Sequence, residues 1–132
     1  MVERTPVNPW MWSLAFGFNQ GELVDGAAKV LFCAGQTSVD ANGAPQHPGD
    51  MAGQVALATD NLEAVLAKAG MTLANLVRLN FYTTDVDAYL EHAAVVGARL
   101  GALGVAPAGT LLGVTRLAFP ELLVEIEGTA VA

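Results

Sequence analysis

The sequence is poor in cysteine and in basic residues, two features that would by themselves indicate the class of protein. Of its 132 residues only Cys33 is a cysteine, which excludes an internal disulfide and a multi-cysteine metal site. Cys33 lies in an apolar run and is expected to be buried. Lysine and arginine number 6 against 13 acidic residues, for a formal net charge of −7. Because nucleic-acid affinity comes largely from clustered basic side chains, no nucleic-acid partner is expected.

Long apolar runs are also missing, although 53% of the residues are hydrophobic and only 14% are charged. A charge-free stretch such as Val105 to Thr115 contains proline and glycine and is too short to span a bilayer. Residues 1–6 do not form a basic segment followed by an apolar one, so we expect no signal peptide, no membrane partner and a cytoplasmic protein. The surplus of apolar residues then indicates surface buried by self-association.

Residue patterns predict a single α+β domain over residues 1–132, with residues 1–12 as an irregular N-terminal arm. Asp50 is a plausible cap for a helix from Met51 to about Ala69, and Gly70 ends it. Residues 84–87 are expected to cap a second helix that runs to about Leu100. Short apolar or alternating segments predict strands at Ser13–Phe18, Lys29–Ala34, Leu76–Thr83, Thr110–Leu117 and Leu123–Val131.

This order places two helices on one face of a mixed sheet and leaves the other face uncovered. In the last strand Glu125 and Glu127 share one side, while Val124 and Ile126 lie on the opposite side. We expect the apolar side to meet the helices. The uncovered side then needs a partner, which agrees with the self-association inferred from composition.

Five segments resemble one known family in their order and spacing. Cys33-Ala34-Gly35-Gln36 is similar to a strand end written S-G-Q, and Gln54 with residues 60–62 and 69–70 is similar to a helix written Q…NL…L..AG. Residues 81–85 resemble its v-y-l-x-d strand and cap. Residues 107–110 occupy the place of P-A-R-[ST], and residues 124–131 match vEiE…AV. From about Phe16 to the end the chain resembles the RidA/YjgF proteins.

The resemblance implies a chorismate-mutase-like fold and a homotrimer whose sheets pack into a central barrel, with three clefts between subunits. Many family members hydrolyse reactive enamines and imines, notably 2-aminoacrylate and its imine tautomer, to ammonia and a 2-keto acid. In that reaction an arginine pairs with the substrate carboxylate, and a glutamate is thought to orient water. No cofactor is implied.

The arginine position of that family is filled here by Gly109, so the carboxylate clamp is absent. Two interpretations stay open. Gly109 is either a loop glycine chosen for conformational freedom, or it opens the cleft to a larger substrate or to one without a carboxylate. The resemblance places four further substrate-binding candidates in the cleft. Phe18 replaces a tyrosine and Ala34 a serine, and Thr110 and Leu111 follow Gly109, which makes the cleft more apolar.

Glu125 and His92 are the catalytic candidates that remain. Beside apolar walls the pKa of Glu125 would rise and suit a general acid or base, unless it is a solvated or ion-paired strand carboxylate. His92 stands where the family has an asparagine and could act with Glu125 across a subunit boundary, unless it is a surface histidine. His47 looks like a loop histidine. Two histidines this far apart predict no metal site.

Three functions are compatible with these residues. The first is a hydrolase or deaminase that acts on a reactive imine or enamine. The second is a trimeric protein that binds a small molecule without turnover. The third is a diverged enzyme that uses Glu125 for proton transfer on an aromatic or carbonyl metabolite. All three place a small molecule in a cleft between subunits.

Overall fold

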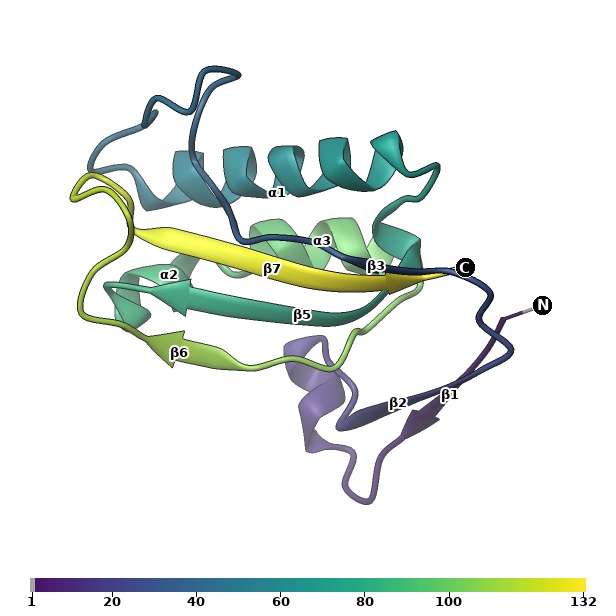
Figure 1. Ribbon diagram of the computed structural model, residues 1–132. Helices are drawn as coiled ribbons and strands as arrows, with labels where there is room; N and C mark the ends of the chain where they lie inside the picture. The colour runs from purple at the N-terminus through teal and green to yellow at the C-terminus, as the bar shows by residue number, and fades with distance from the viewer. Residues whose placement is uncertain (1) are drawn as a thin grey trace.

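A mixed sheet forms the middle of the computed structural model, which describes residues 2–132 (Figure 1). The strand order is β3-β7-β5-β6, and β4 also pairs with β7. β5 and β6 run parallel, whereas β7 is antiparallel to β3, β4 and β5. The strand bounds are β3 Val30–Phe32, β4 Gln36–Thr37, β5 Leu76–Thr83, β6 Leu111–Gly113 and β7 Val124–Val131.

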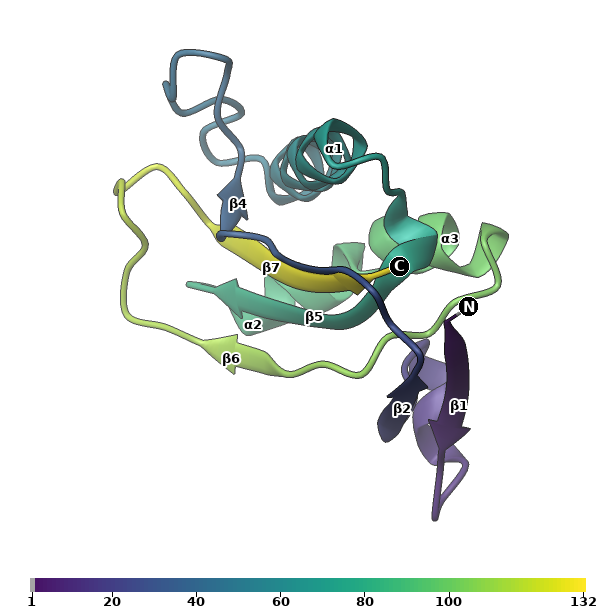
Figure 2. The ribbon, with the colours of Figure 1, turned by 45° about the vertical axis from the view of Figure 1, so that its right-hand side comes forward.

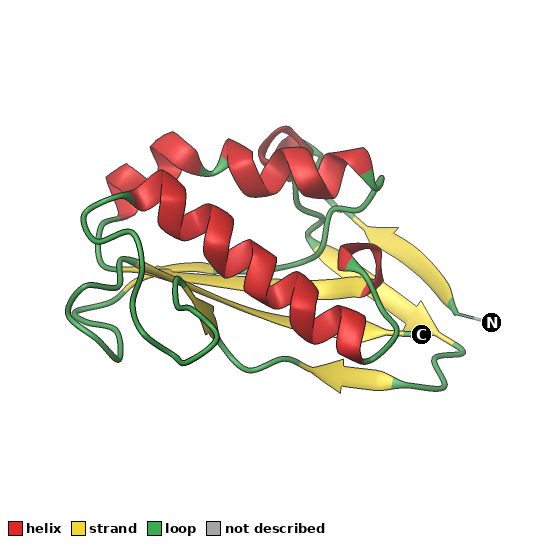
Figure 3. Ribbon diagram, turned by 90° about the horizontal axis from the view of Figure 1, so that it is seen from above, coloured by secondary structure: helices red, strands yellow, loops and turns green. Residues whose placement is uncertain are grey.

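All the α-helices lie on one face of this sheet, as the view from above shows (Figure 3). α1 spans Met51–Lys68, and the Asp50 side chain caps it by accepting from the backbone N–H of Gly53 at 3.0 Å. Gly70 follows with φ +75°, as the sequence predicts. The predicted second helix is divided at Ala93 into α2, Val86–His92, and α3, Ala94–Ala102. Within residues 2–132 no helix has the length and apolar character to cross a bilayer.

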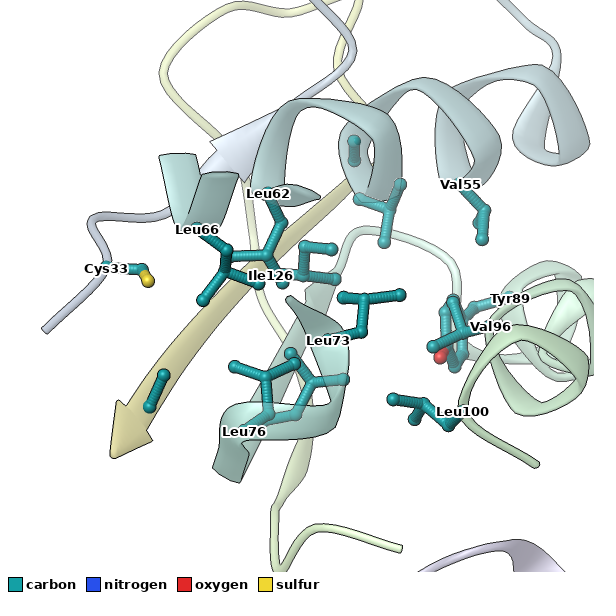
Figure 4. Close-up of a cluster of buried hydrophobic side chains, with 14 of the residues drawn as sticks. Cys33, Val55, Leu62, Leu66, Leu73, Leu76, Tyr89, Val96, Leu100 and Ile126 are labelled. Atoms are coloured by element: carbon teal, nitrogen blue, oxygen red, sulfur yellow. The ribbon is translucent and has the colours of Figure 1, made fainter. Parts of the chain in front are cut away.

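The core lies between these helices and the sheet (Figure 4). Leu62 and Leu66 of α1 are fully buried and point toward Ile126 of β7. The predicted alternation of β7 is confirmed, since Ile126 and its apolar neighbours face the helices while Glu125 and Glu127 lie on the open face. Cys33 is buried at the margin of this core, and burial raises the pKa of its thiol.

The N-terminal residues correct two predictions. The supposedly irregular arm contains strand β1, Glu3–Val7, which pairs antiparallel with β2, Gly21–Asp25, in a small sheet of its own to one side of the larger one (Figure 2). The strand predicted at Ser13–Phe18 is wrong, because Trp12–Phe16 form a 3-10 helix, η1, that Gly17 ends with φ +82°. An apolar run this short does not distinguish a helical turn from a strand.

Arg4 attaches this hairpin to the rest of the chain. Its guanidinium donates to the carbonyl oxygens of Ala74 at 2.5 Å and Leu76 at 2.6 Å, and it pairs with Glu22 of β2 at 3.1 Å. Ala74 and Leu76 lie in and just after a second 3-10 helix, η2, Leu73–Asn75. The hairpin therefore holds η1 beside the edge of the larger sheet. The strand predicted at Thr110–Leu117 is also shorter than expected, because β6 ends at Gly113.

Candidate functional site

A pocket of about 410 Å³ opens between η1, the helices α2 and α3, and the β5–β6 edge of the larger sheet. Four of the predicted substrate-binding residues line it: Phe18, Gly109, Thr110 and Leu111. Leu111 pairs with Phe81 of β5, so both side chains are on the face of the sheet that carries the helices. The structure thus brings together the residues that precede β2 and those that lead into β6.

Aromatic rings form much of the pocket wall. The ring of Trp12 meets Phe16 and Phe18 edge to face, with centroids 6.3 and 5.8 Å apart. Phe81 of β5 and Tyr89 of α2 also line the pocket, with their ring centroids 5.4 Å apart. Burial raises the pKa of Tyr89, which keeps its phenol neutral. The pocket is therefore a site for apolar and aromatic groups.

Charge is missing from this pocket among the described residues. Its lining residues with polar side chains are Trp12, Tyr89 and Thr110, and none of these carries a formal charge at neutral pH. The nearby arginines are engaged or exposed elsewhere: Arg99 pairs with Asp60 at 2.7 Å, and Arg116 donates to carbonyls of its own loop. Arg78 of β5 is exposed on the open face of the sheet, where its charge acts on Glu127, and it does not line the pocket either. Within residues 2–132, therefore, no cationic side chain lines this pocket.

Gly109 lies closer to its neighbours than either sequence interpretation assumes. Its φ is not positive, so it is not there for conformational freedom. The backbone of residues 108–110 runs along β5, with the N–H of Leu79 donating to Ala108 at 2.9 Å and the N–H of Phe81 donating to Thr110 at 2.8 Å. A Cβ on Gly109 would overlap the carbonyl oxygen of Leu79. Glycine is needed here because the β5 backbone occupies the place of a side chain.

Glu125 lies on the other face of the sheet, opposite Tyr82. Its half-buried carboxylate rests against the backbone of Gly35, where a Cβ would overlap it. Desolvation, and then the charge of Glu127, raise the pKa of Glu125. Within residues 2–132 we find no hydrogen bond to the Glu125 carboxylate, so its oxygens are free to bind water or a ligand.

The pKa of Glu127, two residues along β7, is shifted in the opposite direction. It accepts hydrogen bonds from the hydroxyl of Tyr82 and from Nδ2 of Asn80, the latter at 3.2 Å. These bonds hold the pKa of Glu127 below its usual value. Sequence reasoning missed Asn80 and Tyr82 as site residues. The alternation of β5 places Asn80 and Tyr82 on the same side of that strand, but only the pairing of β5 with β7 shows that they meet Glu127.

The remaining candidates lie apart from the pocket. Ala34 is exposed in the loop between β3 and β4, next to Gly35. His92 is half-buried at the end of α2 and is not among the residues that line the pocket. The described residues contain no group of three or more His, Cys, Asp or Glu side chains placed to hold a metal ion. Within one chain, the candidate base and the apolar pocket are on opposite faces of the sheet.

This mixed sheet, covered by helices on one face and open on the other, defines an α+β fold of the chorismate-mutase-like class. The family described as Endoribonuclease L-PSP matches residues 15–132, and the chain belongs to this Rid/YjgF family, as its motifs predict. The chain is similar to the RutC family protein YjgH of Escherichia coli, with 32% identity over 89% of this chain and 88% of that protein.

Two solved structures share the fold over almost the whole chain. The Rid family protein YyfB from Yersinia pestis is 36% identical, with a TM-score of 0.82, and the comparison covers 98% of both chains. Rv2704 from Mycobacterium tuberculosis, a member of the YjgF/YER057c/UK114 family, is 30% identical with a TM-score of 0.68 over 98% of this chain and 100% of that one.

Proposed function

We propose that this protein is a Rid-family hydrolase that acts on a reactive imine or enamine, with Glu125 as the group that activates water. The observation that carries the proposal is the state of the Glu125 carboxylate, which is half-buried, close to Gly35 and free of a hydrogen-bonding partner among the described residues. A carboxylate whose pKa is raised toward neutrality is a more effective base than one in bulk water.

In the proposed reaction Glu125 takes a proton from water as the water oxygen bonds to the imine carbon. The protonated Glu125 gives that proton to the nitrogen, which yields a carbinolamine. Glu125 then carries the hydroxyl proton of the carbinolamine to the nitrogen as the C–N bond breaks, ammonia leaves and the C=O bond forms. The overall change adds one water and releases one carbonyl product and one ammonia. Glu127 supports this role, because Tyr82 and Asn80 keep it ionised and its charge makes Glu125 more basic.

A complete site then combines two copies of the chain, and we propose that the protein is a homotrimer. Glu125 is on the open face of the sheet, whereas the pocket is on the helical face, so the two can cooperate only across a subunit boundary. The open face also exposes Val30 by 52% and Phe32 by 79% on β3, a large apolar area for a chain that is alone in water. His92 keeps its predicted assisting role within this proposal.

A second function, ligand binding without turnover, is favoured by the apolar pocket. It lacks a charged side chain among the described residues, and Gly109 offers no clamp for a carboxylate. Such a protein would use the pocket and leave Glu125 idle. Proton transfer at Glu125 on a carbonyl metabolite is the remaining alternative.

The substitution Glu125→Gln tests the proposal. Imines are generated in the cuvette by an amino-acid oxidase, or by mixing ammonia with aldehydes and ketones, and hydrolysis is followed as product formation. We expect the wild-type protein to accelerate hydrolysis and Glu125→Gln to lose about 100-fold or more of that acceleration, the usual contribution of a general base.

Glu121→Gln is the matched control, because Glu121 is exposed in the loop before β7 and the same charge is removed there. It should keep wild-type activity. Full activity in Glu125→Gln would show that Glu125 is not the base. Ligand-induced thermal stabilisation, with no imine of the panel hydrolysed by the wild-type protein, would replace the hydrolase with the binding protein.

A further inference from the structure

We infer that the pocket between η1, α2 and α3 selects uncharged ligands with an aromatic or bulky aliphatic group, and that the substrate is an imine without a carboxylate. That the ligand is a substrate rests on the proposed function, whereas the ligand class follows from the pocket alone.

The electrostatics of the pocket disfavour an anionic ligand. Moving a carboxylate into a site removes its hydration, and the loss is recovered only by a positive charge or several hydrogen-bond donors. No lining residue of this pocket, within residues 2–132, carries a positive charge, and Arg99 is held by Asp60 and Glu63 on the far side of α3. An anionic ligand therefore loses more on entering than it gains, while a neutral one keeps the benefit of burying its apolar surface.

The space beside Gly109 is occupied as well. A loop that merely lacked its arginine would leave space, and a cation from elsewhere could fill it. At Gly109 the space is taken by the carbonyl of Leu79, and that oxygen presents negative rather than positive potential to the loop. The close approach of residues 108–110 to β5 in this chain therefore leaves no room at Gly109 for a side chain that could pair with a carboxylate.

The size and the aromatic lining of the pocket suit a small apolar molecule. A volume of about 410 Å³ is within the range of small-molecule sites. The wall formed by η1 and the residues after it carries the rings of Trp12 and Phe18, edge to face, and the wall formed by β5 and α2 carries those of Phe81 and Tyr89. A planar ring between such walls gains both burial and favourable ring contacts. A small aromatic or branched aliphatic molecule fits these properties better than a short anionic amino-acid imine.

Two stable ketones that differ by the carboxylate test the ligand class directly. Benzylacetone carries a methyl group where 2-oxo-4-phenylbutanoate carries the carboxylate, and both resemble hydrolysis products. Binding to the native protein is followed by calorimetry and by tryptophan fluorescence, to which Trp10 and Trp12 both contribute. We expect benzylacetone to bind at least tenfold more tightly than the keto acid.

The substitution Gly97→Leu tests whether the ligand binds in this pocket. Gly97 lines the pocket from α3, and a Cβ added there meets nothing within 4 Å, so a leucine fills the pocket without disturbing the helix. Gly101→Leu is the matched control, one turn further along the same helix, equally open and outside the lining. Gly97→Leu should weaken benzylacetone binding at least tenfold, and Gly101→Leu should leave it unchanged, with both variants at least as thermally stable as the native protein.

Several outcomes overturn the inference. Tighter or equal binding of the keto acid contradicts the ligand class, and equal effects of the two leucine variants place the ligand elsewhere. If neither ketone binds and Gly97→Leu instead alters the sedimentation coefficient, the pocket holds part of a second copy. Selective ketone binding without any imine turnover preserves the ligand class and refutes the hydrolase. Glu125-dependent turnover of carboxylated imines alone preserves the hydrolase and refutes the ligand class.

Discussion

At the scale of single residues, the two glycines Gly35 and Gly109 do most to define the surroundings of the candidate site. Each lies where a Cβ would overlap a neighbouring group, the carboxylate of Glu125 in one case and the carbonyl of Leu79 in the other. The side chain of Glu125 can bend away from Gly35, whereas the backbone of β5 cannot bend away from Gly109. Gly109 is therefore the more constrained of the two positions.

Gly109→Ala is accordingly expected to destabilise the protein. The added methyl group forces the 108–110 segment away from β5 and strains its hydrogen bonds to Leu79 and Phe81. Overpacking of this kind costs about 1–3 kcal/mol, measured as the free energy of unfolding in urea. Gly101→Ala, in open space on α3, should instead stabilise the protein by about 0.5–1 kcal/mol because alanine is the better helix former. Equal stability of the two variants would mean that the loop moves freely.

At the scale of elements, the β1–β2 hairpin matters because it holds η1, and η1 forms one wall of the pocket. The hairpin is held by a small number of contacts, among which Arg4 bridges Glu22 and the carbonyls of Ala74 and Leu76. The Glu22 side chain is only 5% exposed, so removal of Arg4 would leave a buried carboxylate without its ion-pair partner. The position of the pocket wall is thus coupled to one buried ion pair.

Arg4→Met tests that coupling. The substitution keeps the apolar stem but leaves Glu22 without its cation, a loss of about 1–3 kcal/mol for a group this buried. We expect amide hydrogen exchange to become faster in β1, η1 and β2 while α1 and β7 keep their protection. Arg116→Met serves as control, since Arg116 is exposed and donates only to carbonyls of its own loop. Unchanged exchange in the hairpin would show that other contacts hold it.

At the scale of the whole molecule, the open face of the sheet is the prominent feature. Its centre carries Glu125, Glu127 and their polar neighbours on β5, and its margin carries the exposed Val30 and Phe32 of β3. A face with a polar centre and an apolar margin is suited to association with copies of itself around a shared interior. The helical face is covered already (Figure 1).

Phe32→Glu should therefore weaken the proposed trimer. A carboxylate buried at the interface without a partner opposes association strongly, so sedimentation velocity at micromolar concentration should show trimer for the native protein and monomer for the variant. Leu103→Glu introduces the same charge at an exposed leucine at the end of α3, on the helical side, and should remain trimeric. A native protein that sediments as a monomer would contradict the trimer itself.

The sequence by itself determined the features that depend on neighbours along the chain. Asp50 and Gly70 mark the ends of α1, the alternation of β7 separates Glu125 from the core, and ordered motifs identify the family over residues 15–132. Each of these signals arises from local geometry, a side chain that caps the first turn or a two-residue repeat along a strand. The division of the second helix at Ala93 is not marked by such a local signal.

Only the tertiary structure decided how distant segments meet. The pairing of β1 with β2 and the end of β6 at Gly113 depend on contacts that no local pattern encodes. The sequence shows only that Gly109 lacks a side chain, whereas the structure shows that β5 leaves no room for one. Glu125 lies on the face of the sheet opposite the pocket. The physical reason is that strand register and close backbone approach are set by long-range packing, which follows from the whole fold rather than from any one segment.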